Sequence, residues 1–200
     1  MLDSLQLTGR ARGHIHQSEE PRFALHRDVL EPYLALRAAA AREGFDLAIF
    51  SGFRDFDSQA EIWNRKFTGE RALFDENGNA IDHSRLSEQD RIQCILNWSA
   101  LPGASRHHWG TEIDVFDRAV LPEGYRVRLL PGEYHPGGVF HRLACWLDEN
   151  IGRFGFFRPY AQYRGGMFAE PWHLSFAAVS VPALAALTPE LVHQHVNYET

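Results

Sequence analysis

The sequence predicts a mixed α+β fold in a single domain. Its 200 residues are enough for one domain with a substantial core, and a chain that is 44% hydrophobic and 23% charged is typical of an ordinary globular protein. Segments with helical and with strand character alternate along the chain, and neither an internal repeat nor a low-complexity linker separates them. We therefore expect one unit that spans residues 1–200.

Four segments have the apolar spacing and the end signals of helices. The first is rich in alanine and ends at Gly44, and Pro32 suggests that its regular part begins near Glu31. Another opens with Ser87 and Asp90, a pair with the spacing of a capping box. The four expected helices cover residues 26–44, 57–67, 87–98 and 139–150.

Three other segments have the composition and the boundaries of strands. They cover residues 45–53, 111–117 and 173–179. Between the second and third expected helices, the polar stretch "DENGNAIDHS" contains Asn77 and Gly78, a dipeptide that favours a tight hairpin turn.

Composition argues against several classes of function. The formal net charge of -6 provides no basic surface for nucleic acid. No apolar run is long enough to span a bilayer, so we expect no integral membrane segment. The N-terminus lacks the basic-then-apolar order of a signal peptide, which predicts action in the cytoplasm, or in the cell envelope or periplasm if a leader has been removed. Nothing in the sequence indicates an oligomeric state.

The chain has two cysteines, Cys94 and Cys145. They are too few for a disulfide framework and do not have the CxxC spacing of a metal or redox motif. Two buried thiols are the favoured interpretation, and a single bridge is the alternative.

The segment "SRHHWGTEID" holds the first candidate site residues. His107 and Asp114 lie seven residues apart, so on a straight strand their side chains would point to opposite faces. A bend at Trp109 and Gly110 would bring the imidazole back over the carboxylate, as two ligands of a zinc site require. His108 would then point away. By itself the pattern also fits histidines that are solvated or bonded to the backbone.

The segment "EPWH" supplies a second group. Glu170 and His173 are three residues apart, so they can share a face just before a strand. With His173 as the third ligand, a zinc ion would keep one open position, which is the catalytic pattern. Glu170 could take a proton from water there as general base. Its alternative role is that of a surface or helix-start carboxylate, and Trp172 is expected to pack beneath the site.

The segment "SGFRDFDSQ" places Arg54 at the end of an expected strand, where its guanidinium could face a cleft. A planar, permanently charged group suits a substrate carboxylate or a developing oxyanion. A surface ion pair with Asp55 or Asp57 is equally consistent with the pattern.

These three segments together resemble the motifs of the VanY-type D-alanyl-D-alanine carboxypeptidases. "SRHHWGTEID" is similar to the family's SxHxxGxxxD motif, "EPWH" to its ExWH motif, and "SGFRDFDSQ" to the SGYR-plus-glutamine segment that precedes them. They occur in the family's order between Ser51 and His173, over most of the chain. The family belongs to a wider metallopeptidase group that includes lysostaphin-like enzymes and the hedgehog signalling domain.

The resemblance implies a fold and a site. The fold would be that of the hedgehog and D-Ala-D-Ala peptidase group, a small, mainly antiparallel sheet that carries the zinc site and is flanked by helices. The motif core would cover about residues 45–180, with the terminal segments packed on it. One Zn²⁺ would be bound by His107, Asp114 and His173. Glu170 matches the general base, and Arg54 matches the residue that stabilises substrate or transition-state charge.

Three further residues match positions that bind or shape the substrate: Ser105, Gln59 and Trp172. One residue departs from the family pattern, because Glu112 stands where a small residue is usual. On a strand, Glu112 and Asp114 share a face. Glu112 could therefore crowd the metal, hydrogen-bond a ligand histidine, or lie just outside the cleft.

The resemblance thus implies a zinc carboxypeptidase whose substrates are peptidoglycan peptides that end in D-Ala-D-Ala, or the D-Ala-D-Ala dipeptide. An LD-carboxypeptidase or a peptidoglycan endopeptidase on the same scaffold is the first alternative. A non-catalytic module that binds zinc or the wall is the second, and the presence of Glu170 with all three ligand types argues against it.

Overall fold

A four-stranded sheet forms the centre of the molecule in the computed structural model, which describes residues 1–196 of the predicted 1–200 unit. Its strands lie in the order β3-β6-β8-β7, and every neighbouring pair is antiparallel. The expectation of an α+β fold with a small antiparallel sheet is confirmed. The strands are β3 (Leu47–Ser51), β6 (Glu112–Asp117), β7 (Phe156–Phe157) and β8 (His173–Phe176).

Two separate two-stranded hairpins are also present within residues 1–196. One lies between the second and third expected helices, and the expected Asn77-Gly78 turn connects its strands, with Gly78 at a φ of 82°. The other hairpin, which is close to the N-terminus, was not expected from the sequence. The hairpin strands are β1 (Ile15–Glu19) with β2 (Arg22–His26), and β4 (Leu73–Phe74) with β5 (Ala80–Ile81).

The four expected helices are present as α2 (Leu30–Arg42), α3 (Phe56–Phe67), α4 (Glu88–Leu96) and α6 (His141–Asn150). The capping signal is confirmed, because the Ser87 side chain accepts a hydrogen bond from the Asp90 N–H. Within residues 1–196, no helix has the length and the apolar character needed to cross a membrane.

The remaining helices were not predicted. They are α1 (Ser4–Leu7), α5 (Pro131–Tyr134), α7 (Ala177–Ala186), α8 (Pro189–Val196) and the 3-10 turns η1 (Arg27–Val29), η2 (His83–Arg85), η3 (Arg106–Trp109), η4 (Arg118–Val120) and η5 (Ile151–Phe154).

Two sequence-based expectations need correction. The strand expected over residues 173–179 ends at Phe176, and α7 follows directly. Strand β6 begins at Glu112, which faces Ser175, so the chain beyond Phe176 finds no partner there and its alanines form a helix instead.

The cysteines are unbridged, as favoured, but they are not buried. Cys94 is half-buried and Cys145 is exposed. Helix α6 turns Leu143 and Leu147 towards the core, which leaves Cys145 on its outer face.

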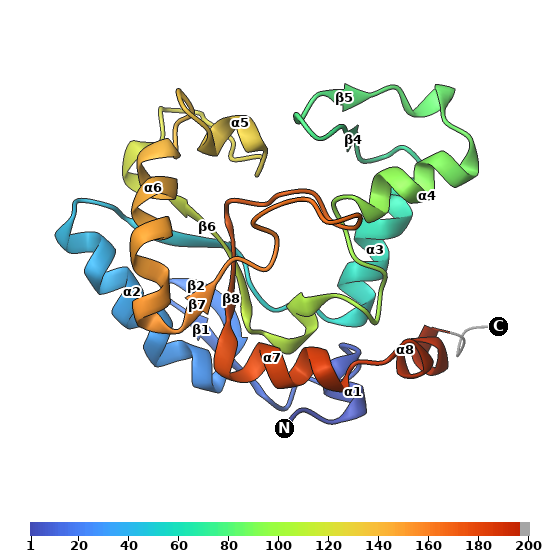
Figure 1. Cartoon of the computed structure of the whole chain (residues 1–200), viewed down its shortest axis with the longest axis horizontal. Helices are drawn as coiled ribbons and strands as arrows, with labels where there is room; N and C mark the ends of the chain where they lie inside the picture. The colour runs from blue at the N-terminus through green and yellow to red at the C-terminus, as the bar shows by residue number, and fades with distance from the viewer. Residues whose placement is uncertain (197–200) are drawn as a thin grey trace.

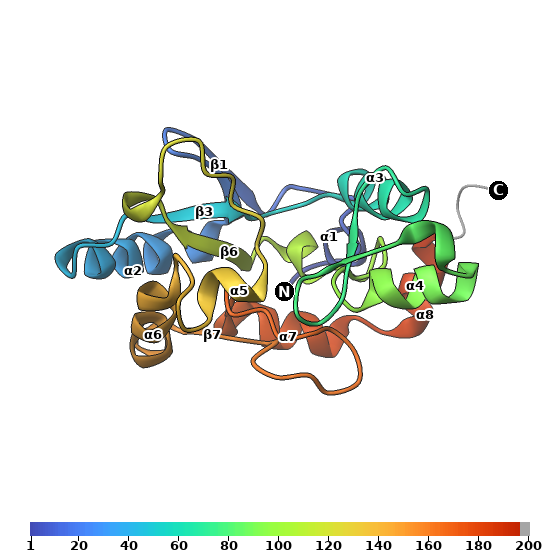
Figure 2. The ribbon, with the colours of Figure 1, turned by 90° about the horizontal axis from the view of Figure 1, so that it is seen from above.

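The main core lies on one face of the central sheet. Ile113 and Val115 of β6 point to this face and are fully buried against α2 and α6. Figures 1 and 2 show these two helices on one side of the molecule and α3 with α4 at the opposite end. Because strand side chains alternate, Glu112 and Asp114 point to the other face of β6. One strand thus separates the hydrophobic core from the polar face.

A smaller core joins the ends of the chain to the middle. Trp109 is fully buried, packs with Leu7 of α1 and Ala183 of α7, and donates from Nε1 to the Leu7 carbonyl at 3.1 Å. The N-terminal and C-terminal elements therefore support the turn that carries His107, which ties both ends of the chain to the candidate site.

We expect the buried side of helix α2 to contribute more to the free energy of unfolding than its exposed side. Leu36 is fully buried, whereas Leu34 in the same helix is 38% exposed. Leu36→Ala should lower the free energy of unfolding by about 2–5 kcal/mol through lost burial and a cavity. The control Leu34→Ala should change it by about 0.5 kcal/mol or less. Urea unfolding followed by circular dichroism measures both, and equal effects would contradict this packing.

Candidate active site

The register of the central sheet brings the three motifs together. Asp114 in the middle strand β6 pairs with His173 of β8 on one side and with Ser51 of β3 on the other. Side chains of directly paired residues lie on the same face of a sheet. The strand pairing therefore places the histidine of "EPWH" beside the aspartate of "SRHHWGTEID".

A turn at Gly110 brings in the third residue. His107 lies in the 3-10 turn η3, and Gly110 follows in the left-handed conformation at a φ of 67°. A Cβ there would lie 2.5 Å from Ile15 Cδ1 and 2.6 Å from the His26 nitrogen, so both the conformation and the space require glycine. The expected bend is confirmed, and it places His107 Nε2 3.5 Å from Asp114 Oδ2.

His107, Asp114 and His173 form a buried group whose ligand atoms all lie within 4.8 Å of one another. Asp114 Oδ1 lies 3.0 Å from His173 Nδ1 and is buried without a hydrogen-bond partner. An unsatisfied buried carboxylate oxygen is costly, and a cation among these three side chains would satisfy it. Two imidazoles and one carboxylate are a donor set that zinc accepts.

Both histidines are oriented by a contact at the ring nitrogen that faces away from Asp114. His107 Nδ1 lies 2.7 Å from the Gly52 carbonyl, and His173 Nε2 lies 2.8 Å from Glu112 Oε2. These contacts leave His107 Nε2 and His173 Nδ1 as the atoms that face Asp114. Metal-binding histidines are commonly held in this way, because the outer acceptor fixes the ring and its tautomer.

Glu112, which departs from the family pattern, is fully buried and bonds to His173. Of the three roles considered, the structure shows the hydrogen bond to a candidate ligand histidine. Its Oε1 accepts from the hydroxyl of Ser175 at 2.8 Å and of Thr111 at 3.0 Å, and it lies 3.2 Å from Arg106 Nη2. The buried charge of Glu112 is therefore compensated, as a buried carboxylate requires.

The pKa values of the two candidate ligand histidines are shifted in opposite directions. Burial, with Arg54 nearby, lowers the pKa of His107 to about 3, so its ring is neutral and can offer a lone pair to a metal. For His173 burial opposes the charged form, but the adjacent carboxylates of Asp114, Glu112 and Glu170 outweigh it and raise the pKa well above its ordinary value.

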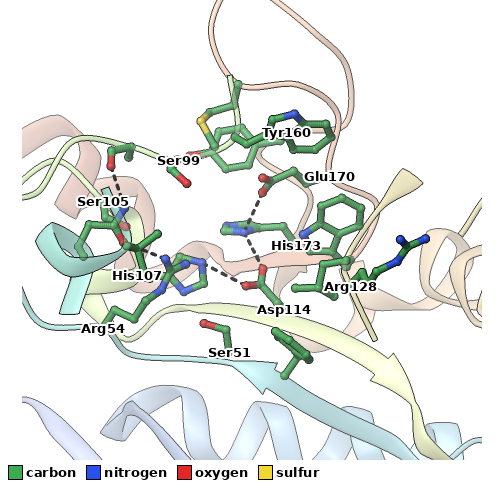
Figure 3. A pocket seen from close by; sticks show the side chains of 18 of the residues that line it. Ser51, Arg54, Ser99, Ser105, His107, Asp114, Arg128, Tyr160, Glu170 and His173 are labelled. Atoms are coloured by element: carbon green, nitrogen blue, oxygen red, sulfur yellow. Dashed lines mark hydrogen bonds and ion pairs between the residues drawn. The ribbon is translucent and has the colours of Figure 1, made fainter. Parts of the chain in front are cut away.

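Glu170 precedes β8 and approaches the histidine from the side opposite Asp114 (Figure 3). Its Oε2 lies 3.3 Å from His173 Nδ1, and its N–H donates to the Tyr160 carbonyl at 2.9 Å. Burial raises the pKa of Glu170. The motif did not point to Tyr160, whose ring centre is 5.0 Å from that of His173.

Arg54 lines the cleft and is fixed by the "HH" pair. Its N–H donates to the His107 carbonyl at 3.1 Å, and its own carbonyl lies 2.7 Å from His108 Nδ1. His108 is fully buried and, as expected, does not join the candidate metal group. The guanidinium donates from Nη1 to Gln59 Oε1 at 2.8 Å.

The expected alternative, a surface pair of Arg54 with an acid of its own segment, does not occur. Asp55 instead caps α3 by accepting from the Ser58 N–H, and Asp57 lies 3.8 Å from Arg10. Both acids are therefore engaged elsewhere.

The three expected substrate-site residues all line the same cleft. Ser105 is buried at the start of η3, and Gln59 is buried between Arg54 and the Ala100 carbonyl. Trp172 is buried and stacks on Trp98 with ring centres 6.0 Å apart, which agrees with packing beneath the site.

The cleft has a volume of about 530 Å³, within the usual size of sites for small ligands. Its wall is richer in cations than the sequence suggested. Lys66, Arg71 and Arg128 join Arg54 there, although the whole chain carries a net charge of -6. Figure 3 shows Arg54 and Arg128 on opposite sides of the candidate metal group. A cleft of this charge favours an anionic ligand.

Sequence reasoning missed Lys66, Ser99 and Arg128, because none of them belongs to a motif. One signal was available for Lys66, which is the only lysine among the 20 lysine and arginine residues of the chain.

Known proteins resemble this chain over much of its length. A family model described as "VanY: D-alanyl-D-alanine carboxypeptidase" matches residues 22–179. A D-alanyl-D-alanine carboxypeptidase of Enterococcus faecalis is 29% identical over 154 residues, which cover 75% of this chain and 47% of that protein. An uncharacterised protein of Haemophilus influenzae is 40% identical over 96 residues, 47% of this chain and 73% of that protein.

Solved structures share the fold. VanYB in complex with D-alanine-D-alanine aligns with a TM-score of 0.60 and 21% identity, over 93% of this chain and 89% of that one. A VanY mutant in complex with Zn(II) aligns with a TM-score of 0.59 and 21% identity, over 92% of this chain and 89% of that one. The LdcB LD-carboxypeptidase aligns with a TM-score of 0.55 and 21% identity, over 86% of this chain and 69% of that one.

These likenesses confirm the predicted fold class, and the family match covers the three motifs in one continuous region. The chain belongs to the VanY D-alanyl-D-alanine carboxypeptidase family.

Proposed function

We propose that the protein is a zinc-dependent carboxypeptidase that hydrolyses the terminal peptide bond of cell-wall peptides ending in D-Ala-D-Ala. The observation that carries this proposal is the group of His107, Asp114 and His173, whose ligand atoms lie within 4.8 Å beside the buried Glu170. Family membership supports it, as do the relatives solved with D-alanine-D-alanine and with Zn(II). The catalytic unit proposed here spans residues 1–200, with its core at about 45–180.

One zinc ion would be bound by His107 through Nε2, by His173 through Nδ1 and by the Asp114 carboxylate. Three protein ligands leave a fourth position open, as in catalytic zinc sites. A bound zinc ion supplies two kinds of chemistry there, because it lowers the pKa of water and polarises a carbonyl oxygen.

Glu170 acts as the general base in this proposal. Its carboxylate lies 3.3 Å from His173 Nδ1, the ring atom that faces the metal position, so a water molecule bound beside the ion would be within its reach. Because burial raises the pKa of Glu170, the group binds a proton more readily than an exposed glutamate does. It takes the proton of the attacking water and returns it to the leaving amine.

Arg54 provides positive charge beside the reacting bond. Its bond to Gln59 Oε1 fixes the guanidinium in the wall of the cleft, where it can offset the negative charge that develops on the carbonyl oxygen. Ser105 and Gln59 shape the wall on this side. Trp172, buried and stacked on Trp98, supports the apolar part of the cleft wall from beneath.

Defined substrates test the specificity. We expect release of D-alanine from the D-Ala-D-Ala dipeptide and from muropeptides that end in it, measured by mass spectrometry of the products. Release of D-alanine only from an L-centre would favour an LD-carboxypeptidase, and cleavage inside the peptide would favour an endopeptidase. Zinc binding without any hydrolysis would favour a binding module, and each of these results would contradict the proposed activity.

The roles of base and ligand should separate by mutation. Glu170→Gln should lower kcat by about 10²- to 10⁴-fold, the usual contribution of a general base, while one zinc per chain is retained. His107→Ala should lose both zinc and activity, and the exposed His135→Ala serves as its control. Metal analysis and product assays measure the two effects. Full turnover by Glu170→Gln would rule out its proposed role.

Removal of the Glu112 carboxylate should weaken zinc binding even when the protein remains folded. Removing the outer acceptor of a metal-binding histidine usually costs about 10- to 100-fold in metal affinity, so Glu112→Ala should weaken zinc binding by that factor. Ser175→Ala is the matched control, because it removes a hydrogen bond from Glu112 but leaves the contact with His173. Chelator competition measures the affinities. An unchanged zinc affinity in folded Glu112→Ala would refute this role.

A further inference from the structure

The only lysine of the chain lies in the wall of the cleft. Lys66 is in the last turn of α3 and is half-buried. Its Nζ donates to Ser99 Oγ at 2.6 Å. An ammonium group has three N–H donors, and within residues 1–196 no carboxylate lies within ion-pair distance of this one. Two donors therefore remain available on a side chain that lines the cleft.

The surroundings of Lys66 are unfavourable for a charge without a partner. Burial, together with the neighbouring Arg71, lowers the pKa of Lys66 to about 8. Its neighbour in sequence behaves differently, because Arg65 is exposed and lies 3.7 Å from both Glu61 and Glu70. The fold thus pairs the surface cation and leaves the cleft cation unpaired, which is the arrangement expected where a ligand supplies the missing negative charge.

Lys66 and Arg54 lie on the same side of the candidate metal group. Figure 3 shows Ser99, to which Lys66 is bonded, on the side of Arg54 and away from Arg128. Arg54 is close enough to Asp114 and Glu170 for both carboxylates to affect its pKa. Two separate cations in the wall of one cleft can therefore serve two different negative charges on one substrate.

We propose that Lys66 and Ser99 form the subsite for the free C-terminal carboxylate of the substrate, so that Arg54 is left to stabilise the oxyanion. The proposal rests on the proposed carboxypeptidase function and deepens it. A peptide bound across the site with a free terminal carboxylate would neutralise the Lys66 ammonium. A peptide that continues beyond this point would bring no charge and would leave the ammonium unpaired. The subsite therefore selects for removal of a terminal residue over internal cleavage.

Paired substrates test the subsite directly. A peptide ending in D-Ala-D-Ala is compared with the same peptide carrying a C-terminal amide, and the ratio of the two kcat/KM values is measured. The wild-type protein should prefer the free acid. In Lys66→Met this preference should fall by roughly ten- to hundredfold, mainly through a higher KM for the acid, because a charge-assisted hydrogen bond is lost.

Arg65→Met is the matched control, because it removes one positive charge at the adjacent position but outside the cleft lining. It should keep the wild-type preference for the free acid. An unchanged preference in folded Lys66→Met would overturn the proposal. So would an equal loss on both substrates, which would instead indicate that Lys66 and Ser99 act in the chemical step.

A measurement that does not depend on the folding of a Lys66 variant uses the single lysine as a probe. Labelling with ¹⁵N-lysine gives one Nζ signal, which can be followed in zinc-loaded Glu170→Ala protein. D-Ala-D-Ala should shift this signal, and the dipeptide amide should leave it in place. The proposal is wrong if the two ligands give the same response or if neither shifts the signal.

The two proposals fail in different ways. If the wild-type protein hydrolyses neither substrate, the carboxypeptidase function itself is wrong. If it hydrolyses the free acid and the amide equally well, peptidase activity stands and only the carboxylate subsite is overturned.

Discussion

The pairing of β6 with β8 is the constraint on which the site depends. It places Asp114 directly opposite His173 and Glu112 directly opposite Ser175. A shift of one residue would turn both rows of side chains to the other face, so that polar groups would enter the core and Ile113 would face the cleft. The buried apolar face fixes this register, since Ile113 and its neighbours pack against α2 and α6. The stability of the core and the geometry of the candidate metal group are therefore two results of one strand alignment.

On the polar face of this sheet, the buried charge of Glu112 depends on its partners. A buried carboxylate such as Glu112 would cost several kcal/mol if it stood alone. Here Arg106 faces it at 3.2 Å, the Ser175 hydroxyl donates to it, and His173 lies 2.8 Å away. The network makes a large, charged side chain acceptable at this buried position. Asp114 Oδ1 is the buried carboxylate oxygen of this group without a hydrogen-bond partner, and a metal ion would satisfy it.

Local signals predicted many elements of the structure. Apolar periodicity and end signals located α2, α3, α4 and α6, and the Asn77-Gly78 turn lies where expected. Prediction failed where the secondary structure of a segment depended on residues that are distant in the sequence. The run after His173 is equally compatible with strand and helix, and β8 stops at Phe176 because its antiparallel partner β6 begins only at Glu112. Helices α1 and α7 are short or lack clear end signals, and burial of Trp109 between them needed the folded arrangement.

By itself the sequence indicated which chemistry is possible, because the spacing of these residues and the resemblance of three segments to family motifs pointed to His107, Asp114, His173, Glu170 and Arg54 before any geometry was known. The tertiary structure alone decided how these groups are oriented and what surrounds them. Which nitrogen of each histidine faces Asp114 depends on contacts with Gly52 and Glu112, residues that are distant from one another in the chain. The tertiary structure alone likewise decided that Lys66 lies in the cleft wall without a carboxylate partner among the described residues. The sequence determines which side chains are charged, but three-dimensional packing determines whether each charge has a partner.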